Sequence, residues 1–150
     1  MGLERFHPFD GRKYSRIWNA LYRQHGDRIR QITISPLGPI STADLLEVHD
    51  FEYLEKLHSK KADAAFIAAA LEVPVLAFLP VSLLQRRILE PMKWATAGTV
   101  LATKEALSSQ LAINLSGGFH HAQAGVGEGF CLYSDIAVAD RKSTRLNSSH

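Results

Sequence analysis

The sequence predicts an α/β fold, in which parallel strands form a central sheet and helices cover both of its faces. Two observations support this prediction. Residues 111–115 form an apolar run with the length of a buried strand, and a glycine-rich loop follows them directly. Several other segments repeat apolar residues at helical spacing. The chemistry of such a fold lies outside the carboxyl ends of its strands, so the loop after Leu115 is the first candidate site.

Composition limits the protein class. An apolar fraction of 46% over 150 residues fits one globular domain, and a net charge of +2 provides no basic stripe for nucleic acid. The longest apolar stretch, residues 73–84, is too short to span a membrane and contains Pro74 and Pro80. No apolar signal segment follows Met1, and the single Cys131 fits a reducing compartment. We therefore expect a cytoplasmic protein, with the nucleus also open to a eukaryotic one, and neither a nucleic-acid nor a membrane partner.

The first 40 residues predict one helix, one short strand and one turn. Asp10 is a good helix cap, and Gly26 is a good helix end. Between them, Tyr14, Ile17, Trp18 and Leu21 recur at helical spacing, which puts the basic residues Arg12, Lys13, Arg16 and Arg23 on the solvent side. The β-branched residues 32–34 predict a short strand, and the prolines and glycine of residues 35–40 predict a turn.

Residues 41–107 predict a series of helices. Residues 41–44 suit a helix start, and a short helix is expected over residues 44–48. Asp50 caps a second helix, and residues 62–71 form an alanine-rich third. A further helix is expected over residues 81–89. Pro91 suits the first turn of the next helix, which should end near Leu107.

The end of the chain predicts a helix whose pattern breaks. Ser134 suits the cap of a helix over residues 134–139, but residues 141–150, RKSTRLNSSH, have no apolar period. We therefore divide the chain into a domain part, residues 1–140, and a tail, residues 141–150. The tail is expected to be foreign sequence, and the alternative is a native disordered tail.

The adjacent His120 and His121 are the leading candidates for catalysis. On an extended loop their side chains would point apart, but Gly117 and Gly118 permit a bend that brings both into one pocket. A neutral imidazole can take a proton from water and return it to a leaving amine, and a charged one can stabilise a tetrahedral intermediate. The alternative is that one or both histidines only pack or cap the loop.

Other polar and aromatic residues have two interpretations each. Phe130 is either a core aromatic or a wall of a substrate channel, and Gly129 would let the backbone approach the substrate. Asp135 could bind a metal, but its place at a helix start favours a partner of the helix dipole. His49 and His58 are spaced too loosely for a zinc pair and are expected on the surface.

Four motifs, in order along residues 1–140, resemble the histone deacetylase superfamily, and most closely its class IV branch, which is like histone deacetylase eleven. The motifs are MGLERFHPFD at 1–10, DLLEVH at 44–49, LQRRILEP at 84–91, and GGFHH at 117–121 followed by GFCLYSDI at 129–136. Together they are far more specific than any one of them alone.

The resemblance implies a fold, a reaction and a set of residue roles. The fold is the three-layer arginase/deacetylase fold around a parallel sheet, and the reaction is zinc-dependent hydrolysis of an acyl group from a lysine ε-amine. The substrate partner is then an acylated lysine of a protein or peptide. By this resemblance His121 is the principal general acid/base and His120 its electrostatic partner, Gly118, Phe119, Gly129 and Phe130 line the acyl-lysine channel, and Lys13 lies near an internal channel.

The same resemblance places the zinc ligands, Asp, His and Asp, after the helix that follows Ile136. The chain is therefore expected to be an incomplete, N-terminal fragment of the domain, without metal ligands and inactive alone. Two alternatives stay open. One is an amidohydrolase of the same superfamily that acts on acetylated polyamines, and the other is a truncated, non-catalytic interaction module.

Overall fold

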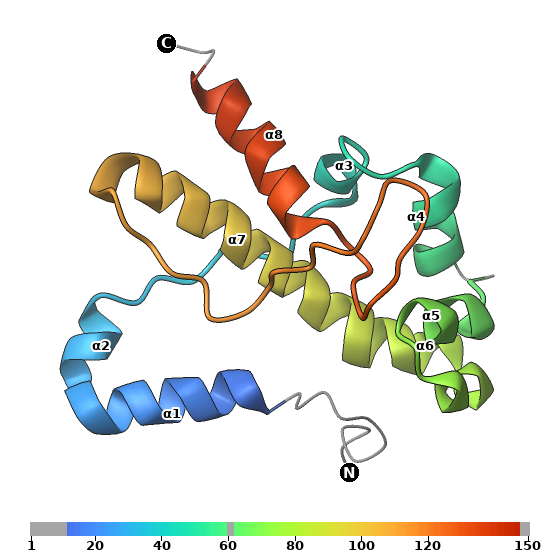
Figure 1. Cartoon of the computed structure of the whole chain (residues 1–150), viewed down its shortest axis with the longest axis horizontal. Helices are drawn as coiled ribbons and strands as arrows, with labels where there is room; N and C mark the ends of the chain where they lie inside the picture. The colour runs from blue at the N-terminus through green and yellow to red at the C-terminus, as the bar shows by residue number, and fades with distance from the viewer. Residues whose placement is uncertain (1–11, 60–61, 148–150) are drawn as a thin grey trace. The chain divides into compact units, whose positions relative to one another are not determined.

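The structure, a computed structural model, describes residues 12–59 and 62–147 as helices joined by irregular segments (Figure 1). The chain divides into two compact units, Met1–Ser35 and Pro36–His150. The first contains helices α1 and α2, and the second contains α3 to α8 together with every residue of the candidate site except Lys13. None of the helices within the described residues is long and apolar enough to cross a membrane.

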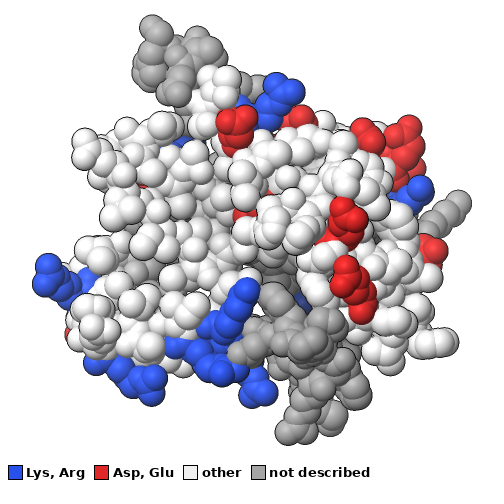
Figure 2. Space-filling view, viewed as in Figure 1, with Lys and Arg blue, Asp and Glu red and all other residues white. Residues whose placement is uncertain are grey.

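The first unit consists of α1, Lys13–His25, and α2, Asp27–Gln31. The predicted helix is confirmed, and it ends at Gly26, whose φ of +56° lies in the left-handed region that glycine tolerates. Its predicted cap, Asp10, lies outside the described residues. The basic residues of α1 are exposed as expected, and Figure 2 shows lysine and arginine side chains over this unit.

Three short helices open the second unit, and polar residues mark their starts. They are α3, Thr42–Leu45, α4, Phe51–His58, and α5, Ala64–Ala70. The Ser41 side chain accepts a hydrogen bond from the backbone N–H of Asp44, and Asp63 accepts one from Ala65. The helix starts predicted at Ser41 and Asp50 are confirmed.

A long helical segment follows a short 3₁₀ turn, η2, Pro74–Phe78. It contains α6, Val81–Leu84, a π-helical turn, η3, Gln85–Leu89, and α7, Glu90–Ser109, with no break between them. The predicted place of Pro91, in the first turn of the helix that ends near Leu107, is confirmed, but no break separates that helix from residues 81–89. Proline lacks an N–H group and crowds the carbonyl four residues earlier, and the wider turn just before Pro91 changes the hydrogen-bond register without ending the helix.

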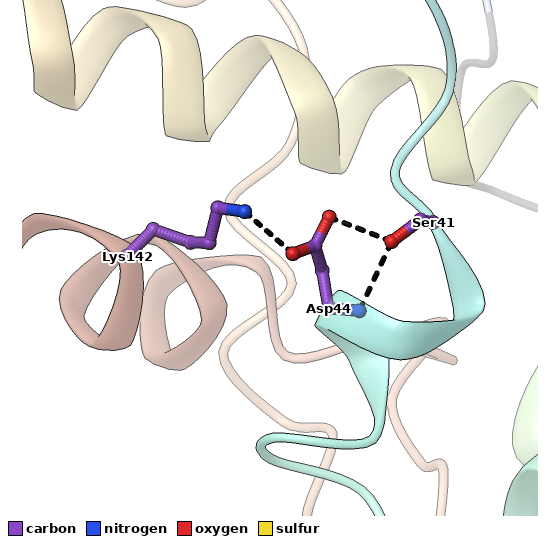
Figure 3. A network of polar contacts seen from close by, with 3 residues as sticks. All are labelled: Ser41, Asp44 and Lys142. Atoms are coloured by element: carbon purple, nitrogen blue, oxygen red, sulfur yellow. Dashed lines mark hydrogen bonds and ion pairs between the residues drawn. The ribbon is translucent and has the colours of Figure 1, made fainter. Parts of the chain in front are cut away.

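The last helix, α8, Asp135–Asn147, packs on α7 and begins directly after Ser134, as predicted. It continues through residues 141–147, so the change of sequence pattern at Arg141 does not end the helix. Lys142 Nζ donates to Asp44 Oδ1 at 2.5 Å, and Asp44 Oδ2 accepts from Ser41, which ties α8 to α3 (Figure 3). The foreign origin of residues 141–150 remains a prediction.

The core of the second unit forms where α4, α5 and the long helical segment meet α8 and residues 131–133. Its apolar side chains are joined by two tyrosines from different parts of the chain, Tyr53 and Tyr133. The segment that carries the candidate site therefore enters the core at residues 131–133 and is anchored there. The largest fully buried apolar and aromatic side chains are Tyr53, Tyr133, Leu45, Leu57, Ile67, Leu84, Leu132 and Val138.

The two predicted strands do not form among the described residues. Residues 32–34 and 111–115 follow an irregular path, and the one bridge in the described part is isolated, between Glu128 and Cys131. Leu111 and Ile113 are 74% and 77% exposed. A strand needs the N–H and C=O groups of a neighbour to complete its ladder, and no described segment lies beside residues 111–115 in that way. The expected parallel sheet is therefore not shown.

Candidate functional site

The candidate site is built on a bent loop, residues 116–121, which we call the histidine loop. Gly117 and Gly118 have φ values of +94° and +81°, a conformation that side chains with a Cβ rarely adopt. The backbone N–H of His120 donates to Gly118 O at 3.0 Å and closes the bend. As a result the imidazoles of His120 and His121 lie side by side, with ring centroids 4.0 Å apart, and both residues are exposed.

The loop is fixed to the rest of the unit by one buried carboxylate. Asp135, the first residue of α8, is fully buried. Its Oδ2 accepts a hydrogen bond from the N–H of Gly118 at 2.8 Å, and its Oδ1 accepts one from the N–H of Phe119 at 2.7 Å. Asp135 thus holds the loop, and among the described residues it belongs to no group of three His, Cys, Asp or Glu side chains that could hold a metal ion.

Two polar residues extend this contact to α7. Thr99 Oγ1 donates to Asp135 Oδ2 at 2.5 Å and accepts from the side-chain amide of Asn114 at 2.9 Å. The Asn114 amide also donates to Ala95 O, and its oxygen accepts from the Ser116 N–H. Sequence reasoning missed Thr99 and Asn114, because Asn114 falls inside the apolar run and Thr99 sits among small residues of a helix.

A second turn lies against His121. A Cβ at Gly129 would be 2.8 Å from His121 Cδ2, so only glycine lets this turn reach the ring. The turn is held by the end of α5 and by a residue just after it, because Phe130 N–H donates to Ala70 O at 3.3 Å and Gly129 N–H donates to Glu72 Oε1 at 3.2 Å. The structure thus brings Gly129 to His121. Phe119 and Phe130 are half-buried.

His49 is buried, and the prediction that it lies on the surface was wrong. Its Nε2 accepts a hydrogen bond from Ser134 N–H at 2.9 Å, so Nδ1 carries the proton that bonds Ala124 O at 3.3 Å. Burial lowers the pKa of His49 below its ordinary value of 6.5. The sequence spacing does not reveal this location, because the segment that covers His49 comes from more than 70 residues later.

His58 is half-buried, so the surface prediction was wrong for it too. Its Nε2 lies 2.7 Å from the hydroxyl of Tyr133. Burial lowers the pKa of His58, and nearby Lys93 lowers it further. Both His49 and His58 therefore belong to the interior that supports the histidine loop and do not take part in its exposed ring pair.

Two further groups near the loop, the Tyr53 hydroxyl and the Cys131 thiol, are buried in their protonated forms. Tyr53 donates its hydroxyl proton to Leu132 O at 2.8 Å, and burial raises the pKa of Tyr53 well above its usual range. Cys131 is buried, and burial raises the pKa of its thiol, which disfavours the thiolate form. Burial therefore favours the protonated form of both groups.

The exposed imidazole pair is the part of this arrangement that can carry out acid–base chemistry. His120 Nδ1 lies 2.9 Å from Gly118 O, and a carbonyl only accepts, so Nδ1 carries the proton in this contact. In neutral His120 the Nε2 atom is then free to accept a proton. Among the described residues, no three His, Cys, Asp or Glu side chains form a group that could hold a metal ion.

Lys13, suggested above for an internal channel, lies in the first unit at the start of α1. Its ammonium group sits 4.9 Å from the centre of the Tyr14 ring. The interaction with an adjacent aromatic ring is one that an exposed lysine on a helix forms locally. Its role in a channel remains a prediction.

Comparison with known proteins gives two kinds of similarity. Residues 7–148 match the sequence profile of the histone deacetylase domain. The chain is 40% identical, over 138 residues, to histone deacetylase 2 of Arabidopsis thaliana, a match that covers 92% of the chain and 34% of that protein. It is also 49% identical over 47 residues to an uncharacterized protein of Picosynechococcus sp., covering 31% of the chain and 16% of that protein. The chain thus spans about a third of the Arabidopsis protein.

Proposed function

The chain belongs to the histone deacetylase family, and from that premise we propose that it forms part of a zinc-dependent enzyme that removes acyl groups from lysine side chains. The observation that supports this most is the exposed pair of imidazoles, 4.0 Å apart and flanked by Gly129. The order of the sequence motifs favours the class IV branch. The whole enzyme is proposed to have the three-layer fold, with residues 111–115 as a strand of its sheet.

The proposed roles follow from the chemistry of amide hydrolysis. One group must take a proton from water and then give it to the leaving lysine amine, which we assign to His121. A second group must stabilise the negative charge of the tetrahedral intermediate, which we assign to His120. The turn at Gly129 and Phe130, with Gly118 and Phe119, would pack against the aliphatic part of the acylated lysine.

Zinc does not fit the described residues, since they contain no group of three ligands. We therefore assign the zinc ligands to a longer natural protein of which this chain is a part, in keeping with the 34% of the Arabidopsis relative that it spans. The substrate partner is an acylated lysine of a protein or peptide in the cytoplasm or nucleus, and the 150-residue chain alone should be inactive.

Activity assays test this proposal directly. The natural protein that contains this sequence and the 150-residue chain would each be incubated with zinc and with acetyl-lysine and myristoyl-lysine peptides. We expect turnover by the natural protein only, and a loss of about 100-fold or more in kcat on His121→Ala, the size typical of a lost general acid/base. His25→Ala, which removes an exposed histidine of α1, is the matched control and should keep full activity.

Two results would contradict the proposal. Full activity of the His121→Ala natural protein would remove His121 from the reaction. Turnover by the 150-residue chain that disappears on His121→Ala would show that residues of this chain complete the site on their own.

A further inference from the structure

We propose that Asp135 is the positioning residue of the histidine loop, and that its carboxylate, supported by Thr99, keeps the imidazoles of His120 and His121 together. The structural half of this inference stands on the contacts of the loop. Only its consequence for catalysis rests on the proposed function. The sequence motif of the two histidines does not by itself predict that a residue of α8 holds the loop.

The direction of the Asp135 side chain supports this role. An aspartate in the first turn of a helix commonly accepts hydrogen bonds from that helix's own free N–H groups. Both oxygens of Asp135 instead accept N–H groups of Gly118 and Phe119, which lie 17 and 16 residues earlier. These two residues directly precede His120, so the carboxylate fixes the backbone from which both imidazoles project.

One peptide unit connects the carboxylate to the ring of His120. The N–H of Phe119 donates to Asp135 Oδ1 at 2.7 Å, and the C=O of the same peptide, from Gly118, accepts from His120 Nδ1 at 2.9 Å. A peptide is planar, so its N–H and C=O turn together. If Asp135 no longer accepted the Phe119 N–H, the peptide could rotate, and the hydrogen bond between the Gly118 carbonyl and His120 Nδ1 would be lost.

The fit around the carboxylate is close. A Cβ at Gly117 would be 2.5 Å from Asp135 Oδ2 and 2.6 Å from Thr99 Oγ1. The carboxylate is fully buried and receives three hydrogen bonds, two from the loop and one from Thr99. Charge-assisted hydrogen bonds of this kind are stronger than neutral ones, and a buried network of them sets one geometry.

Asparagine at position 135 would preserve the shape of the side chain but not its function. An amide has one oxygen and one NH₂ group, so in either orientation the NH₂ would face a backbone N–H that needs an acceptor. Asp135→Asn should therefore release either Gly118 or Phe119. Asp140→Asn, the same change at an exposed aspartate of the same helix, is the matched control.

The first measurement needs no activity. In the 150-residue chain, nuclear Overhauser contacts would be recorded between the His120 and His121 rings and, as a reference, between the His49 and Tyr53 rings, whose centroids lie 5.4 Å apart. We expect Asp135→Asn to abolish the His120–His121 contact and keep the reference contact. Asp140→Asn should keep both.

Thr99 provides a gentler second variant. Thr99→Val removes the hydroxyl that donates to Asp135 at nearly constant volume and should weaken the His120–His121 contact, and Thr99→Ser should restore it. If the Asp135→Asn protein does not fold, the comparison of Thr99→Val with Thr99→Ser tests the inference instead. A retained ring contact in Asp135→Asn, or in Thr99→Val where that pair decides, would overturn the inference. So would a reference contact that disappears together with the ring contact in every variant.

A second measurement connects the loop to catalysis. In the natural protein, Asp135→Asn should lower kcat by about 100-fold, the size expected when catalytic groups are displaced by about 1 Å, and leave KM nearly unchanged. An inactive wild-type protein would refute the proposed function but leave the ring-contact result valid. An unchanged kcat in Asp135→Asn, in an active protein, would overturn the positioning role alone.

Discussion

Single glycines decide how closely the two turns of the candidate site approach each other. Gly129 has a φ of +55°, and the His121 ring occupies the space that a Cβ would need. Gly26 has nearly the same φ, +56°, but nothing lies within 4 Å of its Cβ position. Both positions therefore carry the cost of a positive φ, and only Gly129 adds the cost of a steric clash.

Gly129→Ala should be more destabilising than Gly26→Ala. Both replacements carry the strain of a positive φ, roughly 1–3 kcal/mol, but only the first forces the His121 ring to move. Urea unfolding gives the two free energies, and the imidazole signals of His121 report the displacement. Equal losses of stability, with unchanged His121 signals in Gly129→Ala, would contradict this account.

Buried histidines make stability depend on pH. Burial lowers the folded-state pKa of His49 below 6.5, so the unfolded state binds the proton more readily. The free energy of unfolding should therefore be highest above pH 6.5. It should decrease as the pH falls from 6.5 through the folded-state pKa of His49. Protonated Nε2 would also lose the Ser134 N–H as a donor.

Urea unfolding between about pH 7.5 and pH 5 measures this dependence. His49→Gln should flatten it, leaving the part due to His58, and His25→Gln, a change of an exposed histidine in α1, should not. A pH dependence that is the same in wild type and His49→Gln would show that His49 is not responsible.

At the scale of elements, caps were easier to predict than turns within helices. Ser41 and Asp50 marked helix starts and Gly26 marked an end. The Ser41 side chain accepts the N–H of Asp44, whereas Asp50 stands at the N-cap position without a side-chain hydrogen bond. The continuity of α6, η3 and α7 was not predictable. It depends on how one π-helical turn adjusts the hydrogen bonds before Pro91, and no residue type signals such a turn.

The contact between α3 and α8 should be weak but measurable. Burial alone would raise the pKa of Asp44, but hydrogen bonds from Lys142 and Ser41 outweigh it and lower the pKa below 3.8. The side chains of Lys142 and Asp44 are 32% and 22% exposed, so solvent screens the pair. Lys142→Met should cost less than about 1 kcal/mol at neutral pH.

Measurements of stability at acid pH show whether the effect of Lys142→Met comes from its ion pair with Asp44. Stability from a lowered carboxylate pKa is present above pH 3.8 and is lost as the pH falls through the folded-state value, so Lys142→Met should reduce this loss. Arg141→Met, a change at the exposed neighbour, should have no such effect. An effect of Lys142→Met that does not weaken with salt would argue against an ion pair.

At the scale of the whole molecule, apolar side chains remain in contact with solvent. Leu111 and Ile113 are 74% and 77% exposed, and they belong to the segment that the sequence predicts as a buried strand. Exposed apolar segments with unpaired backbone groups promote association. The isolated chain should therefore self-associate as its concentration rises.

Ile113→Lys should reduce this association and change the free energy of unfolding by less than about 0.5 kcal/mol, as is usual for an exposed position. Ser108→Lys adds the same charge nearby without removing an apolar side chain, and should associate like wild type. Sedimentation velocity at several concentrations compares the three proteins. Equal association of all three would show that the apolar segment is not the cause.

The sequence allowed most of the helices and several of their ends to be predicted, and Gly117 and Gly118 indicated where the histidine loop could bend, because each depends on residues close together in the chain. Strands at 32–34 and 111–115 did not form, since a strand depends on neighbours that the pattern of one segment cannot supply. Burial of His49 and the contacts of Asp135 with Thr99 and the histidine loop were not predicted either. They arise from segments that meet only after the chain has folded.

Two hydrogen bonds join α4 and the residue before it to the segment before α8, and they also affect the order of folding during synthesis: His49 accepts one from Ser134 N–H, and Tyr53 donates one to Leu132 O. They join residues 85 and 79 positions apart, and such distant contacts form late because a long stretch of chain must first be closed. The interior around α4 therefore cannot be completed until Ser134 has left the ribosome. Until then the apolar sides of the newly made helices stay exposed to solvent. A chaperone could bind these exposed apolar surfaces during that interval.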